Sequence, residues 1–483
     1  MFWRGVWGYL PANIVQGVVG FLAIVVFTRL LSPEDFGRYA LAYSVFTLAH
    51  VAVFTWLEAA MARYWAAETP ETGLADHFAS LYRAAFWLSA AFIPLVILGL
   101  MLWPVEPAFR LALGVALIGV PVRSLAKLAQ ERYRASGEVG KAAGLDMATV
   151  IGGFLIGVIF ALAGLGGAAP LLGLLLAPLF ALPFILPGEL KHARGGRPDP
   201  ARLKRYATFG YPIAASLILS LVLASTDRFL LAVFMNEAAV GAYHAGYSIA
   251  NRTLDVMFIW LGAAGAPAMV MALERGGREA LQTAAREQAG LFVLVGLPAA
   301  VGVMLVAQPL AEVLIGQDLR SAAALITPWI ALGAALSGVT VYYFNQVFTL
   351  GHRTDRMLLT MAVPAIANVI LNLILIPRFG VLGAAWATAA SFTLGLLASI
   401  LIGRTVMRLP IPWEALIRCG VACAVMAGVV SLIPAVGGPV ELIAKAAIGG
   451  AVYAAVALTV NAAGVRDTGR RLLNAYRTRG AEA

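Results

Sequence analysis

Long apolar runs, separated by short polar segments, follow one another along the whole chain. A helix needs about 20 apolar residues to cross the hydrocarbon of a bilayer, and about fourteen runs are long enough. They lie near residues 8–31, 39–60, 81–103, 109–128, 143–164, 169–188, 208–234, 241–265, 288–307, 323–344, 357–376, 381–403, 414–434 and 441–462. The pattern predicts an all-α integral membrane protein with about fourteen transmembrane helices. Because this number is even, both termini are expected on one side.

The composition excludes a soluble enzyme. Apolar residues make up 61% of the 483 positions and charged residues 12%, against roughly 45–50% and 25% in a soluble domain. The first run has only Arg4 before it and exceeds the apolar region of a signal peptide, so we expect it to be retained as the first helix. Cys419 and Cys423 are the only cysteines. They are interpreted as small packing residues, since two thiols in lipid make no metal site.

The net charge of +10 is distributed unevenly among the connections. The basic connections hold Arg132, Arg134, Lys141, Lys191, Arg194, Arg197, Arg202, Lys204, Arg205, Arg275, Arg278, Arg286, Arg353 and Arg356, and the tail adds Arg466, Arg470, Arg471, Arg477 and Arg479. The opposite connections are short and hold chiefly Arg38, Arg110, Arg320 and Arg378. By the positive-inside rule both termini are predicted in the cytoplasm. The basic balance reflects topology, and no nucleic acid partner is expected.

The segment Gly37 to Ala62 recurs as Gly241 to Ala266. The gapless match places Gly37, Tyr39, Tyr43, Ser44, Phe54, Trp56 and Leu57 on Gly241, Tyr243, Tyr247, Ser248, Phe258, Trp260 and Leu261. A second match, Gly164 to Ala169 with Gly380 to Ala385, follows in the same order. The order predicts parallel repeats related by an axis along the membrane normal, as in several transporter folds.

The repeat defines the expected domains. We predict an N-terminal six-helix lobe over 1–188, a cytoplasmic linker over 189–206 and a C-terminal six-helix lobe over 207–404. Two extra transmembrane helices over 405–462 and a basic cytoplasmic tail over 463–483 complete the chain. Ser32 is the predicted cap of a helix that begins at Pro33, with Glu34 and Asp35 in its first turn. The segment Pro377 to Gly380 is predicted to separate two later helices.

No nucleotide-binding loop, HExxH motif or paired-cysteine metal motif occurs in the sequence, so an ATP-driven pump is not expected. Ionisable groups inside spans are costly and therefore candidate functional residues. Arg252 and Asp255, three residues apart, share one helical face with Ser248. The equivalent stripe of the first repeat holds Ser44 and Glu58. A stripe that is polar in both repeats is predicted to line the cavity between the lobes; alternatively, Arg252 and Asp255 only neutralise each other.

Other polar residues in spans are further candidates. His50 lies at the depth of Arg252 and is a candidate proton acceptor or phosphate contact, or else a hydrogen-bonded core residue. Arg123 either lines the cavity or extends to the membrane surface. Three weaker candidates follow: Arg29 is interpreted as an interfacial anchor rather than a ligand, and Asp227 and Arg228 as a local ion pair.

Three segments together resemble one known family. They are Thr28 to Tyr39, Asp227 to Leu231 followed by Val240 to Tyr243, and Asn372 to Thr388. These residues look like those of the polysaccharide-biosynthesis flippases. Such flippases are the Wzx-type O-antigen and exopolysaccharide exporters of the multidrug/oligosaccharidyl-lipid/polysaccharide superfamily. The resemblance covers the first twelve spans, and its motifs are structural turns that identify the family better than the substrate.

The resemblance implies two six-helix lobes that alternate between inward-open and outward-open states. It implies a polyprenyl-pyrophosphate-linked oligosaccharide carried across the bacterial inner membrane, with other polysaccharide-assembly membrane proteins as candidate partners. Arg252 is the first choice for the pyrophosphate, because arginine binds phosphate oxygens bidentately. Glu58 and Asp255 are candidates to take up coupling protons or sodium ions, or to orient Arg252. No cofactor is expected.

Two alternatives remain open. Cation-coupled multidrug exporters share the fold that the resemblance implies, but they typically carry an acidic cation site on the first helix, where this chain offers only Asn13 and Gln16. A polymerase or ligase for lipid-linked glycans usually has a large periplasmic loop with catalytic arginines and histidines. The sequence contains no such loop, so a secondary transporter, not an enzyme, is expected.

Overall fold

The computed structural model describes residues 2–68 and 73–466. Within these ranges the chain is all-α, with no β-strand, so the predicted fold class is confirmed. The chain forms two compact units, Met1–His244 and Ala245–Ala483. The basic tail predicted over 463–483 lies outside the described residues from position 467 onward.

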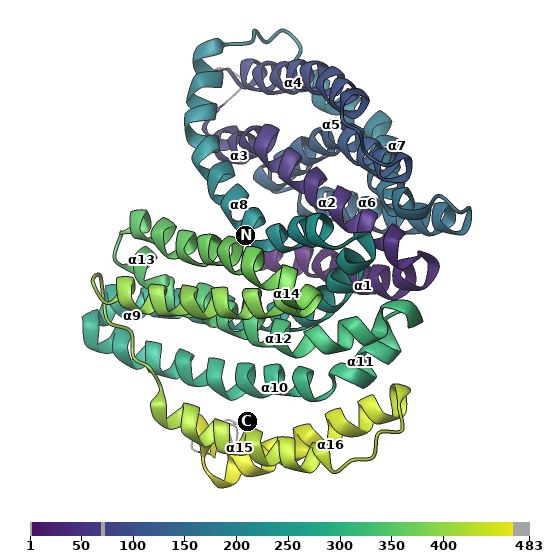
Figure 1. Cartoon of the computed structure of the whole chain (residues 1–483). Helices are drawn as coiled ribbons and strands as arrows, with labels where there is room; N and C mark the ends of the chain where they lie inside the picture. The colour runs from purple at the N-terminus through teal and green to yellow at the C-terminus, as the bar shows by residue number, and fades with distance from the viewer. Residues whose placement is uncertain (1, 69–72, 467–483) are drawn as a thin grey trace, which may run out of the picture. The chain divides into compact units, whose positions relative to one another are not determined.

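The described part of the first unit is built from eight α-helices and two short 3-10 turns, together with the start of a ninth helix (Figure 1). In chain order they are α1 (Phe2–Leu30), α2 (Pro33–Val53), α3 (Thr55–Tyr64), η1 (Trp65–Ala67), α4 (Leu74–Leu102), α5 (Pro107–Ala135), α6 (Val139–Leu162), η2 (Gly166–Ala168), α7 (Ala169–His192) and α8 (Pro200–Phe234). The first residues of α9 also belong to this unit.

The second unit holds the rest of the chain (Figure 1). Its elements are α9 (Glu237–Leu291), η3 (Phe292–Gly296), α10 (Leu297–Leu305), α11 (Ala307–Leu314), η4 (Gln317–Leu319), α12 (Arg320–Val339), η5 (Thr340–Phe344), α13 (Gln346–Leu350), α14 (Thr354–Gly403), α15 (Trp413–Ser431), α16 (Gly438–Thr459) and η6 (Ala462–Gly464). η3 and η5 are π-helical turns.

The described residues hold eleven helical stretches that are long and apolar enough to cross a membrane. The number is twelve if α2 and the helix after it, bent by 49°, form one span. The chain is therefore a multi-pass membrane protein. Two stretches, Glu237–Leu305 and Arg356–Gly403, contain 69 and 48 residues, enough for two spans of about 20 residues each. The predicted total of about fourteen stays a prediction.

Each of these two long stretches is interrupted at a glycine. Gly277 has φ of 67° and Gly380 has φ of 57°, and both leave the helical conformation. Only glycine adopts such values without strain. Gly380 ends the predicted turn segment that starts at Pro377, and a Cβ on Gly383 would collide with the carbonyl of Leu375 on the preceding segment. The predicted separation of two helices at this position is confirmed.

The start of α2 also follows the sequence prediction. The Ser32 hydroxyl accepts a hydrogen bond from the Asp35 backbone N–H at 3.1 Å, and Pro33 occupies the first turn together with Glu34 and Asp35. Such a cap satisfies one of the backbone donors that a helix start leaves without a partner.

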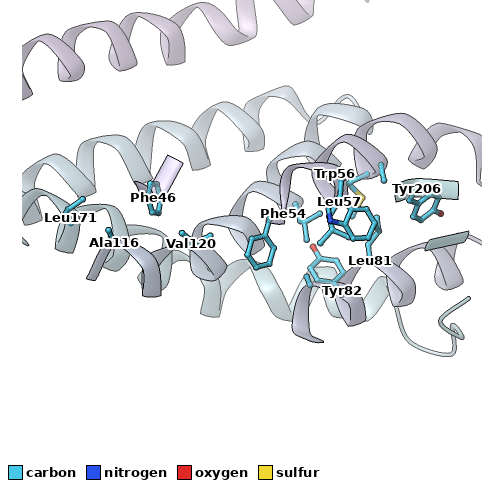
Figure 2. Close-up of a cluster of buried hydrophobic side chains, with 14 of the residues drawn as sticks. Phe46, Phe54, Trp56, Leu57, Leu81, Tyr82, Ala116, Val120, Leu171 and Tyr206 are labelled. Carbon is cyan, nitrogen blue, oxygen red and sulfur yellow. The ribbon is translucent and has the colours of Figure 1, made fainter. Parts of the chain in front are cut away.

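Large apolar side chains fill the first unit where α2 gives way to α3. Phe54, Leu57, Leu81 and Tyr206 are fully buried and belong to one cluster, which Figure 2 shows together with Trp56 and Tyr82. They come from α3, α4 and α8 and from the junction between α2 and α3. Because lipid tails are as apolar as leucine, close packing rather than exclusion from water must favour these helix contacts. The cluster surrounds the junction at which α2 and α3 are bent by 49°.

Aromatic stacking organises the interior of the second unit. The rings of Phe258 and Phe292 stack with centroids 5.7 Å apart, and Tyr343 lies 6.3 Å from Phe292. α15 and α16 pack against each other and against α10. Cys419 and Cys423 are buried free thiols in this packing, which confirms their interpretation as packing residues.

Candidate functional site

Charged and polar side chains gather inside the first unit, on helices that are otherwise apolar. We call this set the polar cluster; its members are Gln16 of α1, His50 of α2, Glu58 of α3, Arg123 and Lys127 of α5, and Asp146 of α6. Contacts described below connect them, and Lys127 also interacts electrostatically with Arg123 and Glu58. The cost of charge inside a membrane makes this cluster the candidate functional site of the unit.

The bend between α2 and α3 brings His50 and Glu58 together. Nε2 of His50 lies 2.9 Å from Oε1 of Glu58, and both side chains are nearly buried. Eight residues of a straight helix rise about 12 Å, so a continuous helix would separate the two groups. The sequence analysis treated His50 and Glu58 as separate candidates, whereas the bend makes them a pair able to share a proton.

Arg123 approaches the same pair through an aromatic ring. Its guanidinium carbon lies 5.7 Å from the ring centroid of Phe46, which stacks in turn on the His50 imidazole at 6.4 Å. An arginine over an aromatic face is held by the ring quadrupole. Arg123 is therefore a half-buried member of the polar cluster. Its predicted place in the lining of a cavity stays a prediction.

Asp146 was missed by the sequence analysis. It is buried and accepts a hydrogen bond from Gln16, and its Oδ1 lies 3.8 Å from Nζ of Lys127. Nζ of Lys127 also donates to Gln130 at 2.6 Å. Asp146 lies near the start of an apolar run and therefore looks like a boundary residue. An acidic group within a predicted span was the signal that could have identified it.

Arg252 and Asp255 lie on α9 in the second unit, and both side chains are exposed. Among the described residues, no ion pair between them is found. Asp255 interacts electrostatically with Tyr342 of η5. Ser248, one turn before Arg252, is buried, as is Ser44 in the first unit, whose hydroxyl donates to the Ala40 carbonyl at 2.8 Å.

The three weaker candidates, Asp227, Arg228 and Arg29, make their hydrogen bonds with residues that are not members of the polar cluster. Asp227 is fully buried, where it accepts hydrogen bonds from the Tyr243 hydroxyl and from the Arg228 backbone N–H. The Arg228 guanidinium donates to the Ala224 carbonyl at 2.9 Å. Arg29 is exposed near the end of α1 and donates to the Val25 carbonyl at 2.6 Å. These contacts give all three residues structural partners.

Within the described ranges, no group of three or more His, Cys, Asp or Glu side chains is arranged to hold a metal ion. The polar cluster instead holds groups that can exchange protons or carry charge. It combines carboxylates, an imidazole and two cationic side chains along membrane-spanning helices. Such an arrangement can bind or relay protons, or bind a small cation.

Comparison with known proteins adds independent information. Residues 26–324 match the family model described as polysaccharide biosynthesis protein. No curated protein sequence matches the chain.

Solved structures resemble the chain in fold at low identity. The lipid II flippase MurJ, in an inward closed conformation, has a TM-score of 0.75 at 14% identity, covering 94% of this chain and 98% of its own. A multidrug resistance MATE family transporter of the MOP superfamily gives a TM-score of 0.57 in its inward-facing conformation. It is 16% identical, and the match covers 82% of this chain and 93% of the transporter. The chain has the fold that these transporters share.

Proposed function

Because the chain belongs to the polysaccharide biosynthesis protein family, we propose that it is a flippase for a polyprenyl-pyrophosphate-linked oligosaccharide. The cargo is the repeat unit of an O-antigen or an exopolysaccharide, carried across the bacterial inner membrane by alternating access. The observation that carries the proposal is the family match over residues 26–324. The fold, shared with a lipid II flippase along nearly the whole chain, supports it.

The pyrophosphate of such a cargo requires cationic partners. An ion without a partner in a low-dielectric medium is prohibitively costly, and arginine can bind two phosphate oxygens at once. Arg252, exposed on a membrane-spanning helix, is the proposed pyrophosphate ligand. Arg123 is the second candidate, since its guanidinium is held over Phe46.

The carboxylates supply the proposed coupling to an ion gradient. Glu58 shares its environment with His50, Asp146 lies beside Lys127, and Asp255 lies on the helix of Arg252. Uptake of protons or sodium ions by these groups would change the charge inside the membrane during the cycle. The uneven distribution of basic residues supports an orientation with both termini in the cytoplasm.

One observation favours a second candidate function, a cation-coupled multidrug exporter. The sequence offers no acidic residue at mid-depth of the first helix, but the fold places the Asp146 carboxylate against Gln16 of α1. An acidic site beside the first helix is therefore present, although it comes from α6. MATE transporters also share the fold, with the lower TM-score reported above.

Reconstitution in liposomes tests the proposal. A fluorescent polyprenyl-pyrophosphate oligosaccharide would be placed in one leaflet, and its arrival in the other measured with a membrane-impermeant quencher. We expect translocation by the wild type and a loss of about tenfold or more in Arg252→Ala, because a hydrogen bond to a charged group contributes about 1.5–3 kcal/mol. Arg275→Ala, which removes an exposed arginine from the same helix, is the matched control and should retain full activity.

The outcomes separate the candidates. Translocation that is equal in Arg252→Ala and Arg275→Ala would reject Arg252 as the pyrophosphate ligand while leaving the flippase in place. Efflux of cationic dyes by the wild type, without translocation of the lipid, would reject the flippase in favour of the multidrug exporter.

A further inference from the structure

A shallow groove of about 450 Å³ lies in the first unit, where α3 meets the beginning of α8. Its lining residues are Tyr64, Ala201, Lys204, Arg205, Thr208 and Phe209. None of them belongs to the polar cluster. The groove is thus a separate feature, formed by two cationic side chains, two aromatic side chains, a threonine and an alanine.

Aromatic rings hold one of the two cations in place. The Arg205 guanidinium carbon lies 5.1 Å from the centroid of Tyr64 and 5.7 Å from that of Tyr206. Tyr64 also packs on Phe209, with centroids 5.7 Å apart. Contacts of this kind orient a guanidinium without neutralising it. Arg205 therefore keeps its positive charge at the groove.

The neighbouring carboxylates are engaged mainly by a different arginine. Glu68 accepts a hydrogen bond from Arg202 and lies 3.5 Å from Nη2 of Arg205, and Asp199 lies 3.6 Å from Nε of Arg202. Lys204 and Arg205 are both exposed. Among the carboxylates of the described residues, Arg205 pairs with Glu68, whose Oε1 it shares with Arg202. The groove consequently presents two exposed cations, one of which shares a carboxylate oxygen.

The position of the groove suggests the chemistry of its ligand. From it, α8 continues into an apolar span that is part of the stretch Pro200–Phe234. Cationic and aromatic side chains at the end of a membrane helix mark the level of the lipid head groups. At that level the abundant anion is a lipid phosphate, which clustered Lys and Arg side chains attract.

We propose that this groove binds the phosphate of a lipid head group. The chemistry is common to two sources, an anionic phospholipid of the bilayer and the pyrophosphate of a polyprenyl carrier. Lys204 and Arg205 contact the phosphate oxygens, and Tyr64 keeps Arg205 in position. The Thr208 hydroxyl, which donates to the Lys204 carbonyl at 2.9 Å, is not needed as a ligand. The site does not depend on the proposed transport function, because it is tested by binding alone.

Binding to the full-length protein tests the site. The protein would be purified in phosphatidylcholine nanodiscs, and the occupancy by phosphatidylglycerol or by polyprenyl pyrophosphate measured by native mass spectrometry. We expect the double variant Lys204→Gln/Arg205→Gln to lose about tenfold or more in affinity for at least one of these lipids. The control Lys191→Gln/Arg194→Gln removes the same charge from exposed positions of the neighbouring polar segment and should change affinity less than about twofold.

A third variant separates geometry from charge. Tyr64→Leu leaves both cations in place but removes a ring that holds Arg205, and we expect about a threefold loss of affinity. If the double variant loses affinity for phosphatidylglycerol alone, the ligand is the bilayer lipid. If it loses affinity for polyprenyl pyrophosphate alone, the ligand is the carrier. Unchanged binding of both lipids by the folded double variant would overturn the site. An equal loss in the control would do the same, since it would indicate diffuse electrostatic attraction.

Discussion

At the scale of single residues, two glycines that the repeat makes equivalent lie against each other. A Cβ on Gly37 would collide with the carbonyl of Glu237, and a Cβ on Gly241 would collide with the carbonyl of Pro33. The backbones of α2 and the start of α9 therefore touch at this point. Small residues allow such close contact between membrane helices. Both repeats therefore carry glycine at this position because a larger side chain would collide with the neighbouring backbone.

We expect Gly241→Ala to lower the free energy of unfolding by about 1–3 kcal/mol, the usual cost of overpacking. Thermal unfolding of the purified protein in detergent measures the effect. Gly99→Ala is the matched control, because no atom lies within 4 Å of the position where its Cβ would be. If the two variants melted at the same temperature, the close contact would not stabilise the fold.

At the scale of helices, one buried ion pair joins two elements that are remote in sequence. Nη2 of Arg132 on α5 lies 2.6 Å from Oε1 of Glu189 on α7, and the Tyr82 hydroxyl of α4 donates to Glu189 at 3.2 Å. Glu189 is only 1% exposed. The pair ties three helices of the first unit together.

Removing Glu189 leaves Arg132 paired with Glu138 but takes away the hydrogen bonds that Arg132 and Tyr82 donate to the Glu189 carboxylate. We expect Glu189→Ala to lower the free energy of unfolding by about 1.5–3 kcal/mol, the contribution of hydrogen bonds to a charged group. The exposed pair Glu414 with Arg418 is the comparison, and Glu414→Ala should cost less than about 1 kcal/mol. Chemical denaturation in mixed micelles measures both, and equal costs would contradict the role assigned to burial.

A second contact between helices depends on pH. Glu312 of α11 accepts hydrogen bonds from the Gly438 backbone N–H at 2.7 Å and from Gln308 at 2.9 Å. The hydrogen bond from Gly438 and, to a smaller extent, that from Gln308 hold the pKa of Glu312 below its ordinary value. The stabilisation is therefore complete above the ordinary carboxyl pKa and is lost as the pH falls through the lowered value.

We expect backbone amides near Gly438 to exchange hydrogen faster, relative to their intrinsic rates, at about pH 4 than at about pH 7. Hydrogen exchange followed by mass spectrometry measures this difference. Glu441 lies nearby and pairs with Lys445 at 2.5 Å, so the variant Glu312→Gln is needed to isolate Glu312. The pH dependence should shrink in that variant; if it stayed unchanged, another group would be responsible.

At the scale of the whole molecule, the proposed coupling makes a transport prediction. If Glu58 and Asp146 take up the coupling ion, Glu58→Gln and Asp146→Asn should each reduce gradient-driven translocation about tenfold or more, because a neutral amide cannot exchange a proton or balance a cation. Liposomes with and without an imposed proton or sodium gradient measure this. Glu34→Gln, an exposed carboxylate at the start of α2, is the control.

Comparing liposomes with and without the gradient separates two roles of Glu58 and Asp146, namely ion coupling and movement of the lipid itself. A variant that has lost stimulation by the gradient but still equilibrates the lipid slowly between leaflets has lost coupling alone. A variant whose activity remains fully stimulated by the gradient would exclude its carboxylate from the coupling site.

The sequence by itself determined the class of the protein and much of its helical pattern. Apolar runs, the Ser32 cap and the glycine at position 380 act locally, so each can be recognised without knowledge of the neighbouring helices. The family followed from such local turn segments. The ionisable residues inside spans could be identified too, because a charged residue in an apolar run is recognisable without knowing which way the helix faces.

Only the tertiary structure decided which charges meet. The contact of His50 with Glu58 depends on the bend after Val53, and Asp146 reaches Gln16 across 130 positions of the chain. Glu189 is the first residue of the segment predicted as a cytoplasmic linker, yet it is buried against Arg132. A sequence shows that a charge is present, whereas packing between distant helices selects its partner. The polar cluster and the groove beside α8 therefore became visible only in three dimensions.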